Sequence, residues 1–235
     1  MSGIRIIHTA SAGFILSIGE TCIAVDALHR GLALEGYPGV TDALWERIRA
    51  GRVPEMAFFT HCHPDHFSYE LAEWAQADWK KTTFLLPERR LDRQILLQGA
   101  EISAHVGDVS LRFVRLPHEA KEFRAVPHYG LIARWEAGTL LAAGDCEIAS
   151  PALACALDGT GVDVAVLNYP WICLQAGRRF IRETLQPKHL LIGHFPAHDA
   201  DVYGYYEKAK RARDRYFADM DVRLLTEPLQ TEIIQ

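Results

Sequence analysis

Short apolar runs, separated by polar and glycine-rich stretches, divide this 235-residue chain into expected strands and helices. Apolar runs of four to eight residues between turn residues are typical of strands, whereas apolar residues recurring every three or four positions indicate helices. We expect strands over 14–18, 21–26, 56–60, 83–87, 108–117, 129–135, 139–144, 162–170, 189–193 and 222–226. We expect helices over 42–51, 69–77, 88–98, 176–185 and 201–217. Gly19-Glu20 and residues 136–138 should each join two strands into a hairpin.

The order of these elements predicts an α/β fold. Strands come first, strands alternating with helices follow, and the pattern occurs in two similar halves. Helices should then cover both outer faces of packed sheets. The chain contains no repeat, low-complexity tract or linker, so we expect a single domain over residues 1–235.

Four expected strands run directly into a histidine or aspartate. The segments are FFT before His61, RLP before His118, LLAAG before Asp145 and LLIG before His194. Ligands of α/β proteins gather at the carboxyl ends of strands. The sequence therefore predicts that these side chains meet at one edge of the molecule.

The segment THCHPDH carries the densest group of titratable residues. His61, His63, Asp65 and His66 lie within six positions, and Pro64 prevents a regular helix across them. Three protonated histidines this close would repel one another, and burying them unpaired costs free energy. A divalent cation relieves both problems. Neutral imidazoles and a carboxylate suit zinc, manganese or iron, so we expect a metal site.

THCHPDH, followed in order by RLPH, LLAAGD and LLIGH, resembles the signature of the metallo-β-lactamase fold superfamily. The resemblance extends from the opening GFILSIGETCIAVD hairpin to LLIGH. The opening and the chain's compactness are similar to the L-ascorbate-6-phosphate lactonase-like branch. The resemblance implies a four-layer αβ/βα sandwich and a binuclear metal-dependent hydrolase.

The resemblance also implies which side chains hold the two metals. The first metal would be bound by His61, His63 and His118. The second would be bound by Asp65, His66 and His194, with Asp145 bridging the pair. His128 in VPHYGL competes with His118 for the third histidine position. We favour His118 because it follows a strand directly.

Two cations about 3.5–4 Å apart can share one water and lower its pKa toward about 7, so that hydroxide attacks a carbonyl or phosphorus. Asp65 or Asp145 would orient this nucleophile and assist proton transfer. His198 in FPAHD either contacts the substrate or donates a proton, or it is a solvent-facing loop histidine. The expected substrate is a small ester-like molecule, either a lactone or a phosphodiester.

Other residues have weaker claims to a role at the site. Tyr169 and Trp171 either form a wall of the substrate pocket or pack a proline-containing turn onto the core. Cys62 and Cys146 flank expected ligands, and burial of small side chains explains them better than nucleophilic catalysis. His8 is more consistent with a core or surface position than with the site.

Composition and sequence pattern argue against several partners and cellular settings. The net charge of −5 argues against broad binding to nucleic acid or an anionic membrane, and no apolar run is long enough to span a bilayer. The broken N-terminal pattern does not predict a secretory signal. Five cysteines without a C-x-x-C spacing do not predict disulfides or a thiolate zinc site, so we expect a reducing, cytoplasmic setting.

Two rival functions stay open. One is a non-catalytic binding or sensor protein that retains its metal. The other is a di-iron oxidoreductase, since some members of the superfamily carry out redox chemistry. Those members typically have a glutamate where this chain has His63, together with a flavin-binding partner domain.

Overall fold

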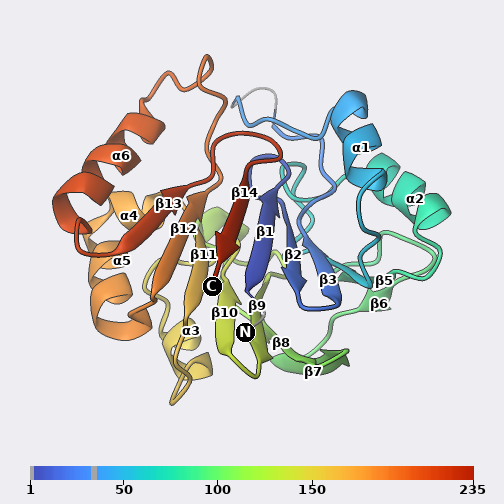
Figure 1. Cartoon of the computed structure of the whole chain (residues 1–235), viewed down its shortest axis with the longest axis horizontal. Helices are drawn as coiled ribbons and strands as arrows, with labels where there is room; N and C mark the ends of the chain where they lie inside the picture. Colours follow the sequence, from blue (N-terminus) through green and yellow to red (C-terminus); the bar gives the residue numbers. More distant parts are fainter. Residues whose placement is uncertain (1–2, 33–35) are drawn as a thin grey trace.

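Two seven-stranded mixed sheets form the centre of the computed structural model, which describes residues 3–32 and 36–235 (Figure 1). The first sheet has the order β14-β1-β2-β3-β4-β5-β6. Its strands are β1 (Ile4–His8), β2 (Phe14–Ile18), β3 (Thr21–Val25), β4 (Met56–Phe58), β5 (Thr83–Leu86), β6 (Ile95–Leu96) and β14 (Thr231–Ile234). The second sheet has the order β13-β12-β11-β10-β9-β8-β7. Its strands are β7 (Glu101–Val106), β8 (Val109–Arg115), β9 (Tyr129–Trp135), β10 (Gly138–Ala142), β11 (Val164–Asn168), β12 (His189–Gly193) and β13 (Asp221–Leu224).

Helices flank the two sheets on opposite sides of the molecule (Figure 1). Beside the first sheet lie α1 (Asp42–Arg49) and α2 (Tyr69–Asp78). Beside the second lie α3 (Pro151–Ala156), α4 (Pro170–Cys173), α5 (Gln175–Phe180), a π-helical turn (Ile181–Leu185) and α6 (Tyr205–Tyr216). The layers are therefore helix, sheet, sheet, helix, which confirms the expected αβ/βα sandwich.

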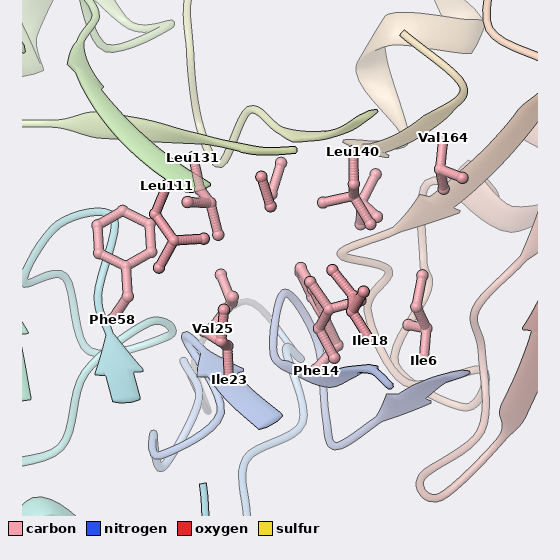
Figure 2. Packing of buried hydrophobic residues seen from close by; sticks show 14 of the residues in the cluster. Ile6, Phe14, Ile18, Ile23, Val25, Phe58, Leu111, Leu131, Leu140 and Val164 are labelled. Atoms are coloured by element: carbon pink, nitrogen blue, oxygen red, sulfur yellow. The ribbon is translucent and has the colours of Figure 1, made fainter. Parts of the chain in front are cut away.

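One apolar cluster fills the space between the two sheets (Figure 2). Alternate residues of each strand point inward, so Phe58 of the first sheet meets Phe113 of the second with ring centroids 4.8 Å apart. One further apolar cluster lies beneath the helices of each outer layer. Burying a large apolar side chain stabilises the fold by about 1.5–3 kcal/mol, so this packing fixes the sheets that carry the site.

Both expected hairpins are present, as β2–β3 and β9–β10. The Ser68 side chain accepts a hydrogen bond from the backbone N–H of Leu71 and begins α2, as its position before the apolar repeat indicated. No described helix is long and apolar enough to cross a membrane.

The helix expected over 88–98 was wrong. The segment is irregular and ends in the short strand β6. The Gln94 side chain accepts from the N–H groups of Arg90 and Leu91 at 2.7 and 2.6 Å, and it donates to the Glu88 carbonyl at 2.8 Å. Such bonds from a side chain to nearby backbone compete with helical hydrogen bonds and offer the segment another structure.

The last helix begins later than expected, at Tyr205 instead of residue 201. The Asp201 carboxylate accepts hydrogen bonds of 2.8 Å from the N–H groups of Tyr205 and Tyr206. Gly204 just before the helix adopts a left-handed conformation, with φ 63°. The edge strands β7 and β14 and the first strand β1 were not expected, because their alternating patterns are short and partly polar.

Candidate metal centre

The candidate site lies where strands of both sheets end. Strands β3 to β6 are parallel, as are β10 to β13, so the carboxyl ends within each set face the same edge. The loop after β4 carries THCHPDH, and His118, Asp145 and His194 follow β8, β10 and β12. The sheet topology thus brings together side chains that are far apart in the sequence.

All seven expected ligands lie in three overlapping groups, each with its ligand atoms within 4.8 Å of one another. The groups are His61, His63 and His118; His61, His66 and Asp145; and Asp65, His66 and His194. The Asp145 carboxylate lies close to histidines of both the first and the third of these groups. One of its carboxylate oxygens lies 3.9 Å from the Nε2 atoms of His61 and His118, and the other lies 3.2 Å from Nε2 of His66.

Several of the expected ligand atoms lie close together or lack a hydrogen-bond partner. Nε2 of His61 lies 3.0 Å from Nδ1 of His63. Nε2 of His118 and Oδ1 of Asp65 are buried without a hydrogen-bond partner among the described residues. Buried polar atoms without partners are costly, and nitrogen and carboxylate donors suit divalent zinc, manganese or iron. The residues present therefore fit divalent cations.

Neighbouring charges shift the pKa values of Asp145 and His66 strongly. Burial by itself would raise the pKa of Asp145, but the nearby His66 and His194 outweigh it and hold this pKa well below its usual range. Burial would lower the pKa of His66, but Asp145 and Asp26 outweigh it and raise this pKa well above the ordinary value. The site is thus built to hold positive charge between ionised carboxylates.

At His61, burial outweighs the attraction of the Asp145 carboxylate. Burial lowers the pKa of His61 well below the ordinary value, and the neighbouring His66 adds to the effect. Burial also lowers the pKa of His63 and His118. These rings are neutral at neutral pH, which is the form in which imidazole binds a metal.

A buried network around Asp26 orients the second group. The Asp26 carboxylate accepts hydrogen bonds of 2.7 Å from the backbone N–H and hydroxyl of Thr60, and it lies 2.9 Å from Nδ1 of His66. The proton of a neutral His66 is therefore assigned to Nδ1, which leaves the Nε2 lone pair directed into the site. The sequence placed Asp26 at a strand end without giving it a role.

Ser11 and Asn168 are two further supporting residues that sequence reasoning missed. The Ser11 hydroxyl lies 3.3 Å from Nδ1 of His194, and the Ser11 carbonyl accepts from the His194 N–H at 2.9 Å. Asn168 donates a hydrogen bond of 2.9 Å to Asp145. Asn168 ends an apolar strand, as the ligands do, and that signal was available. Ser11 stands in a turn with no such pattern.

His128 lies behind the ligands and belongs to none of the three groups. Its ring is fully buried, with centroids 5.3 Å from His61 and 5.8 Å from His118. Neither ring nitrogen has a hydrogen-bond partner in the described part of the chain. His8 also lies beside the cluster, and its Nε2 is 3.0 Å from the Ser11 carbonyl.

Aromatic side chains border the ligands on two sides. The exposed ring of Phe123 lies 4.7 Å from His63 and 5.3 Å from His118, centroid to centroid. On the other side, the Tyr37 ring lies 4.8 Å from that of His194. The Tyr37 hydroxyl donates to that of Tyr169 at 3.5 Å, so Tyr169 joins this aromatic border.

Four other residues considered from the sequence belong to none of the ligand groups. Trp171 is fully buried against Phe180 in the core beneath the helices. His198 is exposed, with its ring 6.2 Å from that of Tyr206, and belongs to none of the ligand groups. Burial raises the pKa of both thiols that flank ligands, Cys62 and Cys146, and this opposes their use as nucleophiles.

No protein-family model and no curated protein matches this chain. Several solved structures do match it. Igni18, a metallo hydrolase from Ignicoccus hospitalis, aligns with a TM-score of 0.69 at 13% identity over 100% of this chain and 99% of its own. The metallo-β-lactamase fold protein YhfI from Bacillus subtilis aligns with a TM-score of 0.64 at 11% identity, over 98% and 99% of the two chains.

The diiron β-hydroxylase CmlA from Streptomyces venezuelae aligns with a TM-score of 0.71 at 15% identity, over 100% of this chain and 54% of its own. These likenesses show that the chain has the metallo-β-lactamase fold. At this level of identity they describe the fold alone.

Proposed function

We propose that the protein is a binuclear metal-dependent hydrolase of a small ester-like substrate, either a lactone or a phosphodiester. The observation that carries this proposal is the meeting of seven nitrogen and carboxylate ligands in three overlapping groups, with Asp145 between the outer two. Two divalent cations bound there, zinc or manganese by preference, would lower the pKa of a shared water and polarise the substrate oxygen.

The chain's own residues supply the remaining functions. Burial would raise the pKa of Asp65, but the hydrogen bond from His194 outweighs it and lowers this pKa to about 2. Asp65 is therefore ionised at neutral pH, and its unpartnered oxygen can accept a hydrogen bond from the attacking water. Phe123 and Tyr37 offer apolar surfaces on either side for the organic part of a substrate.

The fold likeness to a metallo hydrolase supports the hydrolytic reading. The likeness to CmlA favours a second candidate, di-iron redox chemistry. His63 weighs against that candidate, because redox members of the superfamily typically have a glutamate at that position. A third candidate is a sensor protein that retains its metal, and it differs from the proposed hydrolase only in lacking catalytic activity.

Elemental analysis of the purified protein, followed by a screen of lactones and phosphodiesters, tests the proposal. We expect about two equivalents of zinc or manganese per chain and turnover of one of these substrate classes. Asp145→Ala should abolish the turnover while circular dichroism shows an unchanged fold. Two equivalents of iron with absorbance changes on reduction would favour redox chemistry. Protein that neither contains nor takes up metal would overturn the proposal.

A further inference from the structure

A second site of different chemistry lies on the helical layer beside the second sheet. A groove of about 720 Å³ lies along one face of α6 and is bordered by Cys173 of α4 and Arg178 of α5. Four cations line it, namely Arg178, Lys208, Arg211 and Arg215, together with a single carboxylate, Asp214. Figure 1 shows these helices at the left of the molecule, outside the sheets that carry the metal centre.

The four cations have no ion-pair partner among residues 3–32 and 36–235. Asp214 is occupied by Arg213, which donates to it at 2.8 Å on the same helix. Neighbouring arginines outside the groove behave differently. Arg179 pairs with Glu183 at 2.8 Å, and Arg182 pairs with Asp219 at 2.5 Å. Positive charge is therefore left unneutralised in the groove, although acidic residues neutralise these two neighbouring arginines.

Two of the cations are held in place by neutral groups. Arg178 donates from Nη1 to the carbonyls of Ile172 and Cys173 at 3.3 and 2.5 Å. The guanidinium groups of Arg178 and Arg215 lie 4.3 and 5.2 Å from the centroid of the same ring, that of Tyr216. Cation–π contacts of this kind fix a guanidinium without cancelling its charge.

Three of the four cations lie near the Cys173 thiol. Burial raises the pKa of the Cys173 thiol, and Lys208, Arg178 and Arg211 act against that rise. Lys208, Arg211 and Arg215 are spaced three and four residues apart, so they lie along one face of α6 over about 10 Å. The groove is within the size range of small-molecule sites, and guanidinium groups bind phosphate through paired hydrogen bonds.

We propose that this groove binds a small molecule bearing two or more phosphate groups, such as a nucleoside diphosphate. One phosphate group lies between Lys208 and Arg211, and the next lies against Arg178 and Arg215. The metal centre is not required for this interaction, so the inference stands apart from the proposed hydrolysis.

The groove nevertheless adjoins the aromatic border of the metal centre. Nζ of Lys208 lies 5.2 Å from the ring centroid of Tyr205. The Tyr205 ring stacks on Tyr169 with centroids 4.6 Å apart, and Tyr169 accepts the hydrogen bond from Tyr37. A ligand in the groove therefore lies about one helical turn from the residues that border the metal ligands.

Calorimetric titration of the metal-containing protein with ADP tests the proposal. We expect saturable binding, with adenosine at least about tenfold weaker because it carries no phosphate. The double variant Lys208→Gln/Arg211→Gln should weaken ADP binding by at least about tenfold, as the loss of two charge-assisted contacts predicts. The matched control Lys210→Gln/Arg179→Gln removes the same charge outside the groove and should change the affinity less than about twofold.

A His61→Ala variant separates the groove from the metal centre. ADP binding that persists in this variant supports the groove. Binding that is lost in His61→Ala but retained in Lys208→Gln/Arg211→Gln would place ADP at the metals and overturn the proposal. Equal losses in the groove variant and its charge-matched control, or wild-type protein that binds no ADP at millimolar concentration, would also overturn it.

Discussion

His66 and His194 are 128 positions apart in the chain, yet their Nε2 atoms lie 3.0 Å apart. Each ring has its other nitrogen beside a supporting side chain. Nδ1 of His66 is 2.9 Å from the Asp26 carboxylate, and Nδ1 of His194 is 3.3 Å from the Ser11 hydroxyl. The supports thus direct both Nε2 atoms toward one point, as partners of metal-binding histidines do. A cation at that point satisfies both rings at once.

Removal of the metals should destabilise the protein. A ligand present at about 1,000 times its dissociation constant stabilises the native state by about 4 kcal/mol, and about 2–4 °C of melting temperature corresponds to each kcal/mol in a domain of this size. We expect chelation with EDTA to lower the melting temperature by about 10 °C, measured by differential scanning fluorimetry. EDTA saturated with calcium is the control, and added zinc or manganese should restore the original value. An unchanged melting temperature after proven metal loss would contradict this expectation.

Substitution of the two competing histidines should separate their roles. His118→Ala should lose about one of two metal equivalents, because His118 lies in a ligand group with His61 and His63. His128→Ala should retain both, since His128 lies in none of the groups. It should instead lower the free energy of unfolding by about 2–5 kcal/mol, because a fully buried ring is deleted. Elemental analysis and urea unfolding measure the two effects. The reverse metal contents would make His128 the ligand.

The sequence could bring four of the seven expected ligands near one another because each of the four directly follows an apolar run. His61, His118, Asp145 and His194 stand at strand ends, and strand order in this fold brings them to one edge. Of the supporting residues, Asp26 and Asn168 share this position at a strand end, whereas Ser11 does not. Ser11 contacts His194 across 183 positions, and the two residues lie in separate loops in which each has a positive φ. A one-dimensional pattern does not encode such a contact.

The helix expected over 88–98 failed for a related reason. Apolar residues recur at helical spacing there, but the Gln94 side chain bonds the backbone N–H of Arg90 and Leu91 and takes the place of helical hydrogen bonds. The burial of Trp171 in the core could not be predicted from the sequence either. Its position after a strand fits a pocket wall equally well, and only the packing of α4 against α6 places it in the core.

Asn168 should act as a positioning residue for Asp145. Its side-chain amide donates to Asp145 at 2.9 Å inside the buried site, so Asn168→Ala removes a contact that fixes the Asp145 carboxylate. Loss of a supporting partner typically costs about 10–100-fold in metal affinity, and we expect a decrease in that range. Competition with a chromophoric chelator measures the affinity. Gln175→Ala, at the exposed start of α5, is the control and should leave it unchanged.

Phe123 should contribute to substrate binding at the proposed active site. Its exposed ring borders His63 and His118 without supplying a ligand atom, so Phe123→Ala removes apolar surface and leaves the metal ligands intact. For a substrate found in the lactone and phosphodiester screen, we expect KM to rise about five- to tenfold with kcat nearly unchanged, as loss of uniform binding predicts. Phe123→Leu keeps an apolar side chain and should recover most of the affinity. A fall in kcat or in metal content would instead show that Phe123 positions the ligand histidines.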